Sequence, residues 1–436
     1  MTQPQVSVGI VSNDSRISFN LSGIYSGQGI EVITGSQEAT ISDSGMAVSW
    51  NGKMYPFIEF TPTAYDGDTF TLKDVTIGVN FHWERREDQR FRGSLRIIAD
   101  NGRLTAINII GVEDYLTSVI SSEMSSTSSL PLLRAHAVIS RSWLLAQMEH
   151  KSEKRTRQRP HAGELVRWWD HEDHQLFDVC ADDHCQRYQG TGRILSDNAI
   201  SAVGSTRGEV LMYAGKLCDT RFSKCCGGVM EVFRSCWDDE DIPYLAPGRD
   251  APDTQDFPDL TNDDEADRWI NGSPSAFCNT TDARILSQVL NSYDRERPDF
   301  FRWTEEYTQE RIRSLISKRL GTDMGDIIDL EPMERGTSGR IVRLRIRGSL
   351  GEIVIGKELM IRRVLSDNHL RSSAFTVEKA DLSPDGLPGR FILHGAGWGH
   401  GVGLCQIGAA VMGDKGYGYE AILSHYYPGS EIIKIY

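Results

Sequence analysis

The sequence predicts a multi-domain α+β protein with a β-rich N-terminal part, a mixed helix–sheet domain and a smaller α/β domain inserted into it. Three observations lead to this class. The chain has 436 residues, which is enough for two or three domains. Residues 1–105 alternate apolar and polar over short runs, as half-buried strands do. Directly after them, apolar residues recur at helical spacing within residues 111–150.

The elements are expected in a simple order along the chain. Turn pairs such as Asn51-Gly52 and Asn101-Gly102 separate the alternating runs, so the β-rich domain should consist of hairpins. Two helices should follow within residues 111–150. Further along, Thr308–Leu320 is amphipathic and predicts another helix, and short apolar runs after it predict strands.

Charge and hydropathy exclude several classes of function. The formal net charge is −14 at pH 7, which disfavours binding to nucleic acid or to an anionic membrane surface. No stretch is long and apolar enough to predict a transmembrane segment. Residues 1–15 have neither a charged n-region nor an apolar h-region, so no signal peptide is visible. Either a leader has been trimmed from this chain, or the protein is not exported by that route.

The most informative stretch is Gly111–His150. Its first helix should end in a Ser/Thr-rich break, and Ser128 or Ser129 can cap a second helix. Pro131 then stands where the first helical turn tolerates proline. Glu123 therefore lies at the end of one helix and just before the start of the next.

The same stretch carries a family signature. The pattern E-D-Y-L-x-x-V-x-x-x-E-M, followed by L-L-R-A-H-A-V-x-S-R-S-W, resembles that of the stage II sporulation protein D (SpoIID) and amidase-enhancer LytB family. In that family the glutamate of the E-M-P step is the catalytic acid of a peptidoglycan lytic transglycosylase. The resemblance therefore implies that Glu123 is the catalytic residue. Ser125 and His136 replace the proline and the glutamine that the family usually has. Arg141 is either a substrate contact or an ordinary ion-pair partner on the helix surface.

Six of the eight cysteines fall between residues 180 and 236, which favours a metal site or buried thiols over a disulfide framework. Cysteines and histidines are dense in His171–Gly190, although their spacing is not that of a zinc finger. Some members of the resembled family bind zinc beside the active site through this loop. A structural zinc is therefore expected, and buried thiols with surface histidines are the alternative. The expected ligands are His174, Cys180, His184 and Cys185, with His171 and Cys225 in reserve.

Two glycine-containing motifs should supply the rest of the site. The run Arg221–Val229 corresponds to the family's F-S-x-S-x-G-G, so Ser223, Gly227 and Gly228 are expected to contact substrate. Paired glycines allow a close backbone approach to a ligand, but a tight turn without a ligand would use them too.

The second motif, Gly395–Gly408, resembles the family's G-x-G-x-G-H-G-V-G-x-x-Q-x-G. No βαβ unit precedes it, so phosphate binding is rejected. His394, His400 and Gln406 can offer polar groups to sugar hydroxyls or to the Glu123 carboxylate, and a purely structural His400 is the alternative.

The resemblance and the patterns together divide the chain. We expect a β-rich domain over 1–105, the first part of the SpoIID/LytB-like catalytic domain over 106–256, an inserted helix–strand domain over 257–380, and a glycine-rich return segment of the catalytic domain over 381–436.

The resemblance implies a lytic transglycosylase that cleaves the MurNAc–GlcNAc β-1,4 bond in stem-peptide-stripped glycan strands and leaves 1,6-anhydroMurNAc ends. Glu123 would serve as general acid and then as base. One alternative is a non-catalytic peptidoglycan-binding protein that enhances an amidase. A zinc amidohydrolase is the other, and four protein ligands argue against it because they leave the metal no open position. The expected partners are glycan strands and an N-acetylmuramoyl-L-alanine amidase, and the expected location is the cell envelope.

Overall fold

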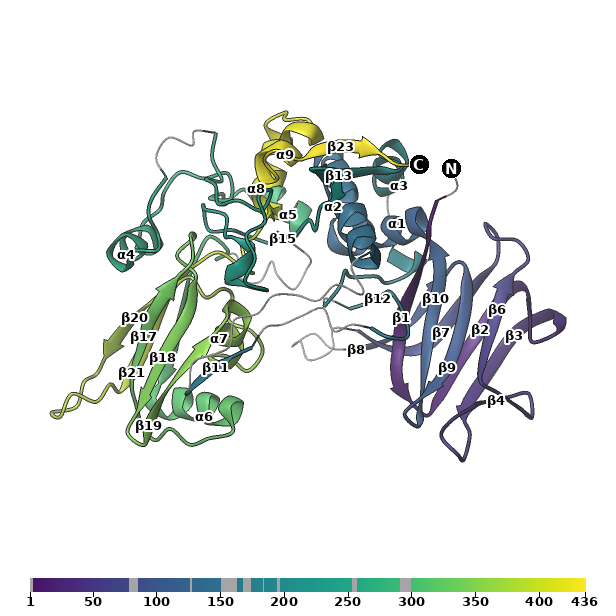
Figure 1. Cartoon of the computed structure of the whole chain (residues 1–436), viewed down its shortest axis with the longest axis horizontal. Coiled ribbons are helices and arrows are strands. Elements are labelled where there is room, and N and C mark those ends of the chain that lie inside the picture. Colours follow the sequence, from purple (N-terminus) through teal and green to yellow (C-terminus); the bar gives the residue numbers. More distant parts are fainter. Residues whose placement is uncertain are drawn as a thin grey trace.

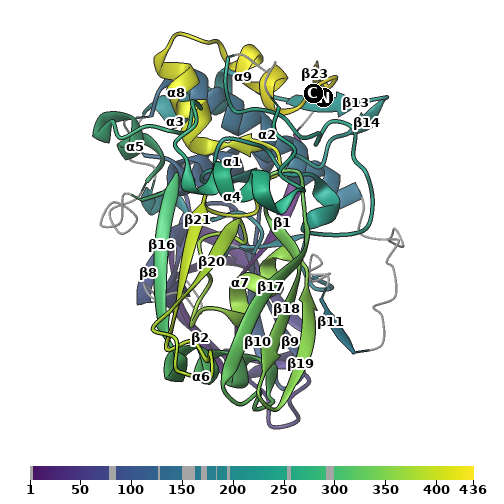
Figure 2. The same ribbon diagram turned by 90° about the vertical axis from the view of Figure 1, so that its left-hand side faces the viewer.

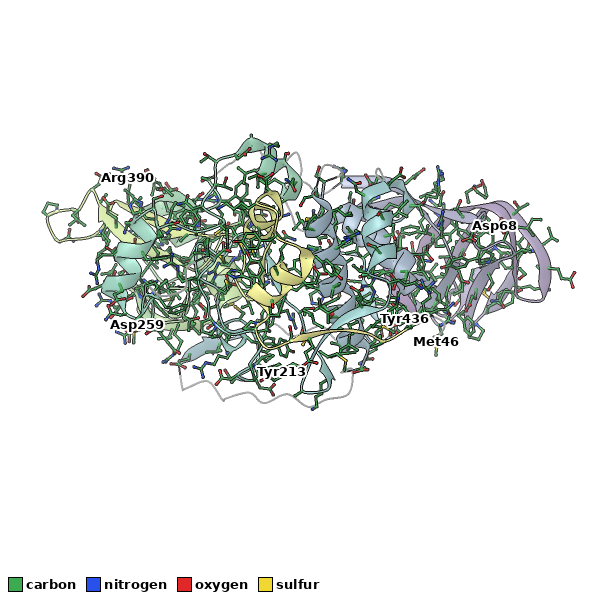
Figure 3. All side chains as sticks on the ribbon, turned by 90° about the horizontal axis from the view of Figure 1, so that it is seen from above. Met46, Asp68, Tyr213, Asp259, Arg390 and Tyr436 are labelled. Carbon is green, nitrogen blue, oxygen red and sulfur yellow. The ribbon has the colours of Figure 1, made fainter. Side chains whose placement is uncertain are left out.

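The computed structural model describes residues 3–77, 85–125, 128–149, 163–167, 174–182, 184–193, 197–252, 257–290 and 299–436. Two β-rich lobes flank a group of helices (Figure 1). Seen from above, the molecule is elongated, with Asp68 at one end and Arg390 at the other (Figure 3). The α+β class predicted from the sequence is confirmed. Among the described residues, no helix is both long and apolar enough to cross a membrane.

Eleven strands of the described chain form the N-terminal sheet, on the right of Figure 1. Its main path runs β12-β1-β10-β9-β6-β2-β3-β4-β5, and β7 pairs with β2 and β8. Alternation sets its inner face, because Ile17, Phe19 and Leu21 of β2 are buried and the residues between them are less so. The strands are β1 (Gln5–Asp14), β2 (Arg16–Gly27), β3 (Ile30–Ile41), β4 (Val48–Trp50), β5 (Lys53–Tyr55), β6 (Phe57–Pro62), β7 (Thr69–Ile77), β8 (Arg85–Phe91), β9 (Ser94–Asp100), β10 (Arg103–Gly111) and β12 (Val179–Cys180).

The central helices surround one long helix, α2 (Leu130–Glu149). Every residue of α2 from 135 to 146 is buried, so the helix is enclosed on all sides. Small residues such as Ala135 and Ser142 let neighbours approach this helix on several faces. The surrounding elements are α1 (Val112–Glu123), α3 (Asp197–Ser205), α8 (Gln406–Asp414), α9 (Tyr419–Tyr426), β13 (Glu209–Tyr213), β14 (Lys216–Leu217) and β23 (Glu431–Lys434).

The second lobe contains two small sheets with the orders β11-β19-β18-β17 and β16-β21-β20, which face the viewer in Figure 2. It has a hydrophobic core of its own, which includes Ile312 and Leu344. The helix predicted at 308–320 is α6, whose N-cap Thr308 accepts a hydrogen bond from the Arg311 N–H. Its elements are β11 (Glu164–Val166), β16 (Arg302–Thr308), α6 (Gln309–Leu320), β17 (Ile327–Arg335), β18 (Ile341–Gly348), β19 (Gly351–Gly356), α7 (Glu358–Val364), β20 (Phe375–Ala380) and β21 (Arg390–Ala396).

The short element η1 (Thr191–Arg193) packs against β8 and α1. The other short elements are β15 (Phe222–Ser223), η2 (Phe233–Ser235), α4 (Asp263–Asn271), α5 (Ala283–Val289) and β22 (Leu404–Cys405). Three strands lie outside the parts to which we assigned them: β12 belongs to the N-terminal sheet, β11 pairs with β19 in the second lobe, and β21 lies between β16 and β20. The domain boundaries at 105, 256 and 380 stay a prediction.

Candidate active site

Glu123 is the last residue of α1, as the sequence predicts. The opposite face of α1 is anchored by buried residues such as Leu116, Val119 and Ile120, and Glu123 itself is half-buried. The chain turns away at Met124, whose backbone is extended. Ser125, which stands where the family has proline, donates its backbone N–H to the Gln288 carbonyl at 3.0 Å. This hydrogen bond, which proline could not make, fixes the turn after Glu123.

The Glu123 carboxylate is held by the segment that runs past the end of α1. Its Oε1 accepts a hydrogen bond of 3.2 Å from the backbone N–H of Arg187. Neighbouring residues fix this segment along α1: the Tyr188 ring stacks on Tyr115, and Ser118 donates to the Gly190 carbonyl at 2.8 Å. We did not predict the contact of Arg187, because almost any residue type can donate a backbone N–H and the sequence therefore gives no signal for it.

The four expected metal ligands come together just before Arg187. We call them the loop cluster: His174, Cys180, His184 and Cys185. Their ligand atoms all lie within 4.8 Å of one another, and His174 Nε2 and His184 Nδ1 are each 3.5 Å from Cys185 Sγ. Metal–ligand bonds of about 2.0–2.3 Å at tetrahedral angles place ligand atoms about 3.5 Å apart. Hydrogen bonding with Cys185 lowers the pKa of the Cys180 thiol, which favours the thiolate that metals bind. The loop cluster could therefore hold a metal ion.

The two reserve ligands do not join the loop cluster. His171 lies outside the described residues. Cys225 is buried beside Cys278 and Cys405, away from the loop, so its assignment to this site was wrong.

The loop cluster is attached to the N-terminal sheet. β12, which ends at Cys180, pairs in parallel with β1, and Gly9 lies opposite Cys180. A Cβ atom at Gly9 would come within 2.5 Å of the Phe177 ring, which in turn packs on His174 at 4.5 Å. Glycine is therefore required at position 9 to let the loop lie against the sheet.

The two glycine-containing motifs are brought together, because β15 pairs in parallel with β22. Ser223 on β15 is buried, and its hydroxyl has no hydrogen-bond partner among the described residues. Its role as a substrate contact stays a prediction. Gly227 and Gly228 have positive φ angles, and a Cβ at either would press on Gly397 N (3.2 Å) or the Trp269 ring (2.9 Å). Packing within the chain accounts for both glycines.

A buried arginine that we did not foresee explains several glycines of the second motif. The Arg340 guanidinium donates to the carbonyls of Gly399 and Cys226 at 2.9–3.1 Å. A Cβ at Gly401 would lie 2.5 Å from that guanidinium. The backbone bends closely around Arg340, and this contact needs no bound ligand.

The three polar residues of the second motif lie in different surroundings. Gln406 is buried and its amide donates to His136 at 3.1 Å, so our prediction that it contacts substrate is not supported by this geometry. His394 lies on β21 and pairs with Glu378 at 3.0 Å.

His400 is half-buried: its Nδ1 accepts the Val402 N–H, its ring packs on Trp237, and burial lowers its pKa. Its contact with substrate stays a prediction.

Arg141 is fully buried and pairs with Glu113 through two hydrogen bonds of 2.7 and 3.0 Å. A third nitrogen donates to the Glu209 carbonyl at 2.9 Å. The Glu113 carboxylate also accepts hydrogen bonds from Tyr436 and from Gly208. Both readings of Arg141 therefore need correction: it is neither placed to touch substrate nor part of a surface ion pair.

His136 should make the protein acid-sensitive. It is enclosed, shares a hydrogen bond with Ser140 and accepts one from the Gln406 amide, and burial followed by the charge of Lys224 lowers its pKa to about 3. An unfolded chain binds a proton at a pKa of about 6.5 and the folded chain does not, so stability falls as the pH drops below about 6.5. Between pH 7 and 5 this group should cost about 2 kcal/mol.

The matched variant is His136→Gln, which keeps the hydrogen bonds and removes the titration. Urea unfolding of both proteins at pH 7 and pH 5 measures the difference, and other histidines cancel in the comparison. An equal loss of stability in the two proteins would contradict this assignment.

The sequence of this chain is similar to a known family model and to several known proteins. Residues 100–213 match the family model described as Stage II sporulation protein, and residues 231–403 match a domain of unknown function, DUF8618. An uncharacterized protein of Brachyspira hyodysenteriae is 25% identical over 79% of this chain and 72% of its own length. The Stage II sporulation protein D of Bacillus amyloliquefaciens is 23% identical over 75% of each chain.

A further relative, the Amidase enhancer of Bacillus subtilis, is 26% identical over 54% of this chain. The match spans 33% of that protein, about one third of its length. The motif around Glu123 lies inside the matched family region, as do the four residues of the loop cluster. The resemblance inferred from the motifs is confirmed: residues 100–213 match the Stage II sporulation protein model, and relatives named Stage II sporulation protein D and Amidase enhancer align with this chain.

Proposed function

We propose that the protein is a peptidoglycan lytic transglycosylase that cleaves the MurNAc–GlcNAc β-1,4 bond in glycan strands stripped of stem peptides. The observation that carries the proposal is the placement of Glu123. It ends a helix whose other face is buried, it remains half-exposed, and its carboxylate is held by the Arg187 N–H directly after the loop cluster. A positioned carboxyl group with access to solvent is what general acid–base catalysis requires.

The other acidic residues of α1 make contacts that stabilise the fold. Glu113 is buried against Arg141. Asp114 accepts a hydrogen bond from Tyr65 at 2.9 Å and lies 3.6 Å from Arg92. Of the acidic residues of α1, Glu123 is therefore the one whose carboxylate is available for acid–base catalysis.

One carboxyl group suffices for this reaction. Glycoside hydrolases normally use a second carboxylate as nucleophile or water activator. In a lytic transglycosylase the 6-hydroxyl of the muramic acid attacks its own anomeric carbon. Glu123 protonates the leaving oxygen as that bond breaks, then accepts the proton of the attacking hydroxyl, and a 1,6-anhydro end results.

We further propose that the loop cluster holds one structural zinc ion. Two thiolates and two imidazoles suit zinc, and four protein ligands close the coordination sphere. Bound there, the metal would brace the loop that presents the Arg187 N–H to Glu123. The zinc would take no part in the reaction, in which Glu123 acts as acid and base.

The double variant Cys180→Ser plus Cys185→Ser tests the zinc proposal. We expect it to lose one equivalent of zinc per chain and, because the loop no longer holds Arg187, about 10–100-fold in activity. Elemental analysis of protein purified without added metal gives the first result. Cys218→Ser, a buried cysteine outside the cluster, is the control and should keep its zinc. Equal zinc content in the double variant and the control would refute the ligand assignment.

Product analysis tests the enzymatic proposal directly. Purified protein is incubated with denuded glycan strands, and mass spectrometry should detect 1,6-anhydroMurNAc ends. Reducing ends in their place would indicate hydrolysis. Intact strands that nevertheless bind the protein would favour the alternative, a binding protein that enhances an N-acetylmuramoyl-L-alanine amidase, as the name of the Bacillus subtilis relative suggests.

The substrate determines where the protein works. Glycan strands lie outside the cytoplasmic membrane, so we propose a location in the cell envelope. The relatives named for sporulation and for amidase enhancement are consistent with a role in cell-wall remodelling.

A further inference from the structure

A second group of metal-ligand residues lies between the central helices and the second lobe. We call it the core cluster: Cys226, Asp250, Cys278 and Cys405. All four residues are buried, and one ligand atom from each lies within 4.8 Å of the other three. They come from the turn after β15, from two positions in the connection that follows, and from the residue that precedes α8. α5 packs against α8, and β15 pairs with β22, the strand that ends at Cys405.

The sulfur atoms have the spacing of shared metal ligands. Cys226 Sγ and Cys278 Sγ are 3.7 Å apart. Two thiolates bound at about 2.3 Å to a tetrahedral ion lie about 3.7 Å apart, whereas a disulfide has a bond of about 2.05 Å. The cysteines are therefore separated as they would be around an ion.

Backbone donors in the core cluster suit thiolates. The Cys226 N–H donates to Cys405 Sγ at 3.3 Å, and the Gly228 N–H donates to Cys226 Sγ at 3.4 Å. Cys405 is also the N-cap residue of α8, where the helix dipole stabilises a negative charge. Hydrogen bonds of this kind orient metal ligands and tune them.

Asp250 is oriented in the same way. It is fully buried, its Oδ1 accepts from the Tyr426 hydroxyl at 2.7 Å and its Oδ2 from the Cys278 N–H at 2.9 Å. A fully buried carboxylate is stabilised by a nearby cation.

The surrounding charge matches a metal with three thiolates and one carboxylate, which would carry a net charge of −2. Arg302 lies beside this cluster, because its guanidinium donates to the carbonyl of Gly227, the residue after Cys226. The hydrogen bonds of its guanidinium in the described structure go to carbonyl oxygens, such as those of Gly227 and Trp269. This half-buried cation has no carboxylate bonded to it in the described structure, and it can offset part of the charge of the complex.

We propose that Cys226, Asp250, Cys278 and Cys405 form a second, closed zinc site. Three soft thiolates with one carboxylate favour zinc in a tetrahedron, and four protein ligands leave no position for a reacting water. The site is structural: it joins the glycine-rich return segment at Cys405 to the connection that enters the second lobe. It does not depend on the proposed enzymatic activity or on the loop cluster.

The test uses the full chain in the Cys180→Ser plus Cys185→Ser background, in which the loop cluster cannot bind zinc. After dialysis against a weak chelator, this protein should retain one equivalent of zinc. Adding Cys278→Ser should remove it, whereas adding Cys218→Ser, a buried cysteine outside both clusters, should not. Less than about a tenth of an equivalent in the background protein would overturn the proposal.

A second measurement avoids variants of the core cluster, which are at risk of misfolding. Cobalt(II) is exchanged for zinc in the background protein, and thiolate-to-cobalt absorption bands in the near ultraviolet are expected. Thiol titration of the denatured protein with a chelator should then find six thiols, the eight cysteines of the chain minus the two replaced. Absence of the bands, or two missing thiols, would establish a metal-free site or a disulfide in place of zinc.

Discussion

Replacing Glu123 by glutamine should abolish the formation of 1,6-anhydro ends while glycan binding and thermal unfolding stay unchanged. Glutamine keeps the size of the side chain and can still accept the Arg187 N–H, but it has no proton to transfer. General acid–base groups contribute roughly 10²–10⁴-fold, so a loss of that order is expected. Mass spectrometry of products measured over time gives the rate.

Asp114→Asn is the matched control, because it neutralises another acid of the same helix that pairs with Tyr65 and Arg92. Its activity should stay near that of the wild type. If Glu123→Gln retained more than about a tenth of the wild-type rate, the acid would have to be sought elsewhere and the amidase-enhancing alternative would gain support.

Removing Arg141 should have the largest effect on stability. Arg141→Met leaves the buried Glu113 carboxylate without its cation, which typically costs about 3–5 kcal/mol. Denaturant unfolding followed by tryptophan fluorescence, to which Trp143 contributes two residues along α2, is a suitable probe. Arg134→Met removes an arginine of the same helix whose hydrogen bond, among the described residues, goes to Ser205 on the exposed side, and it should cost less than about 1 kcal/mol.

The double variant Glu113→Gln plus Arg141→Met distinguishes an unpaired charge from lost packing. Because no buried charge remains in it, the double variant should regain part of the stability that Arg141→Met loses. A double variant no more stable than Arg141→Met would show that lost packing and not charge sets the cost.

The sequence predicted the features that depend on neighbouring residues. Helical spacing placed α1 and α2 and put Glu123 at the end of α1. The density of cysteine and histidine over a few residues pointed to the loop cluster, because its four candidate ligands lie within 174–185.

Features that depend on distant residues escaped prediction. The core cluster draws its ligands from positions 226 to 405, so no local spacing could reveal it. Gln406 belongs to a glycine-rich motif that resembles a ligand loop, yet α2 supplies its partner, His136. In the same motif the glycines make room for Arg340, a residue of the second lobe. Side-chain type alone cannot tell an internal partner from a substrate.

The pairing of β12 with β1 has a consequence for the order of folding. Ser7 and Asp178 stabilise this pairing through four hydrogen bonds, although they are 171 positions apart in the chain. Contacts between such distant positions form slowly, because a long loop must close before they contribute. A nascent chain therefore carries β1 long before its neighbour Val179 has been synthesised. Arg187 can engage Glu123 only once the loop has docked, so we expect catalytic competence to appear in the last stage of folding.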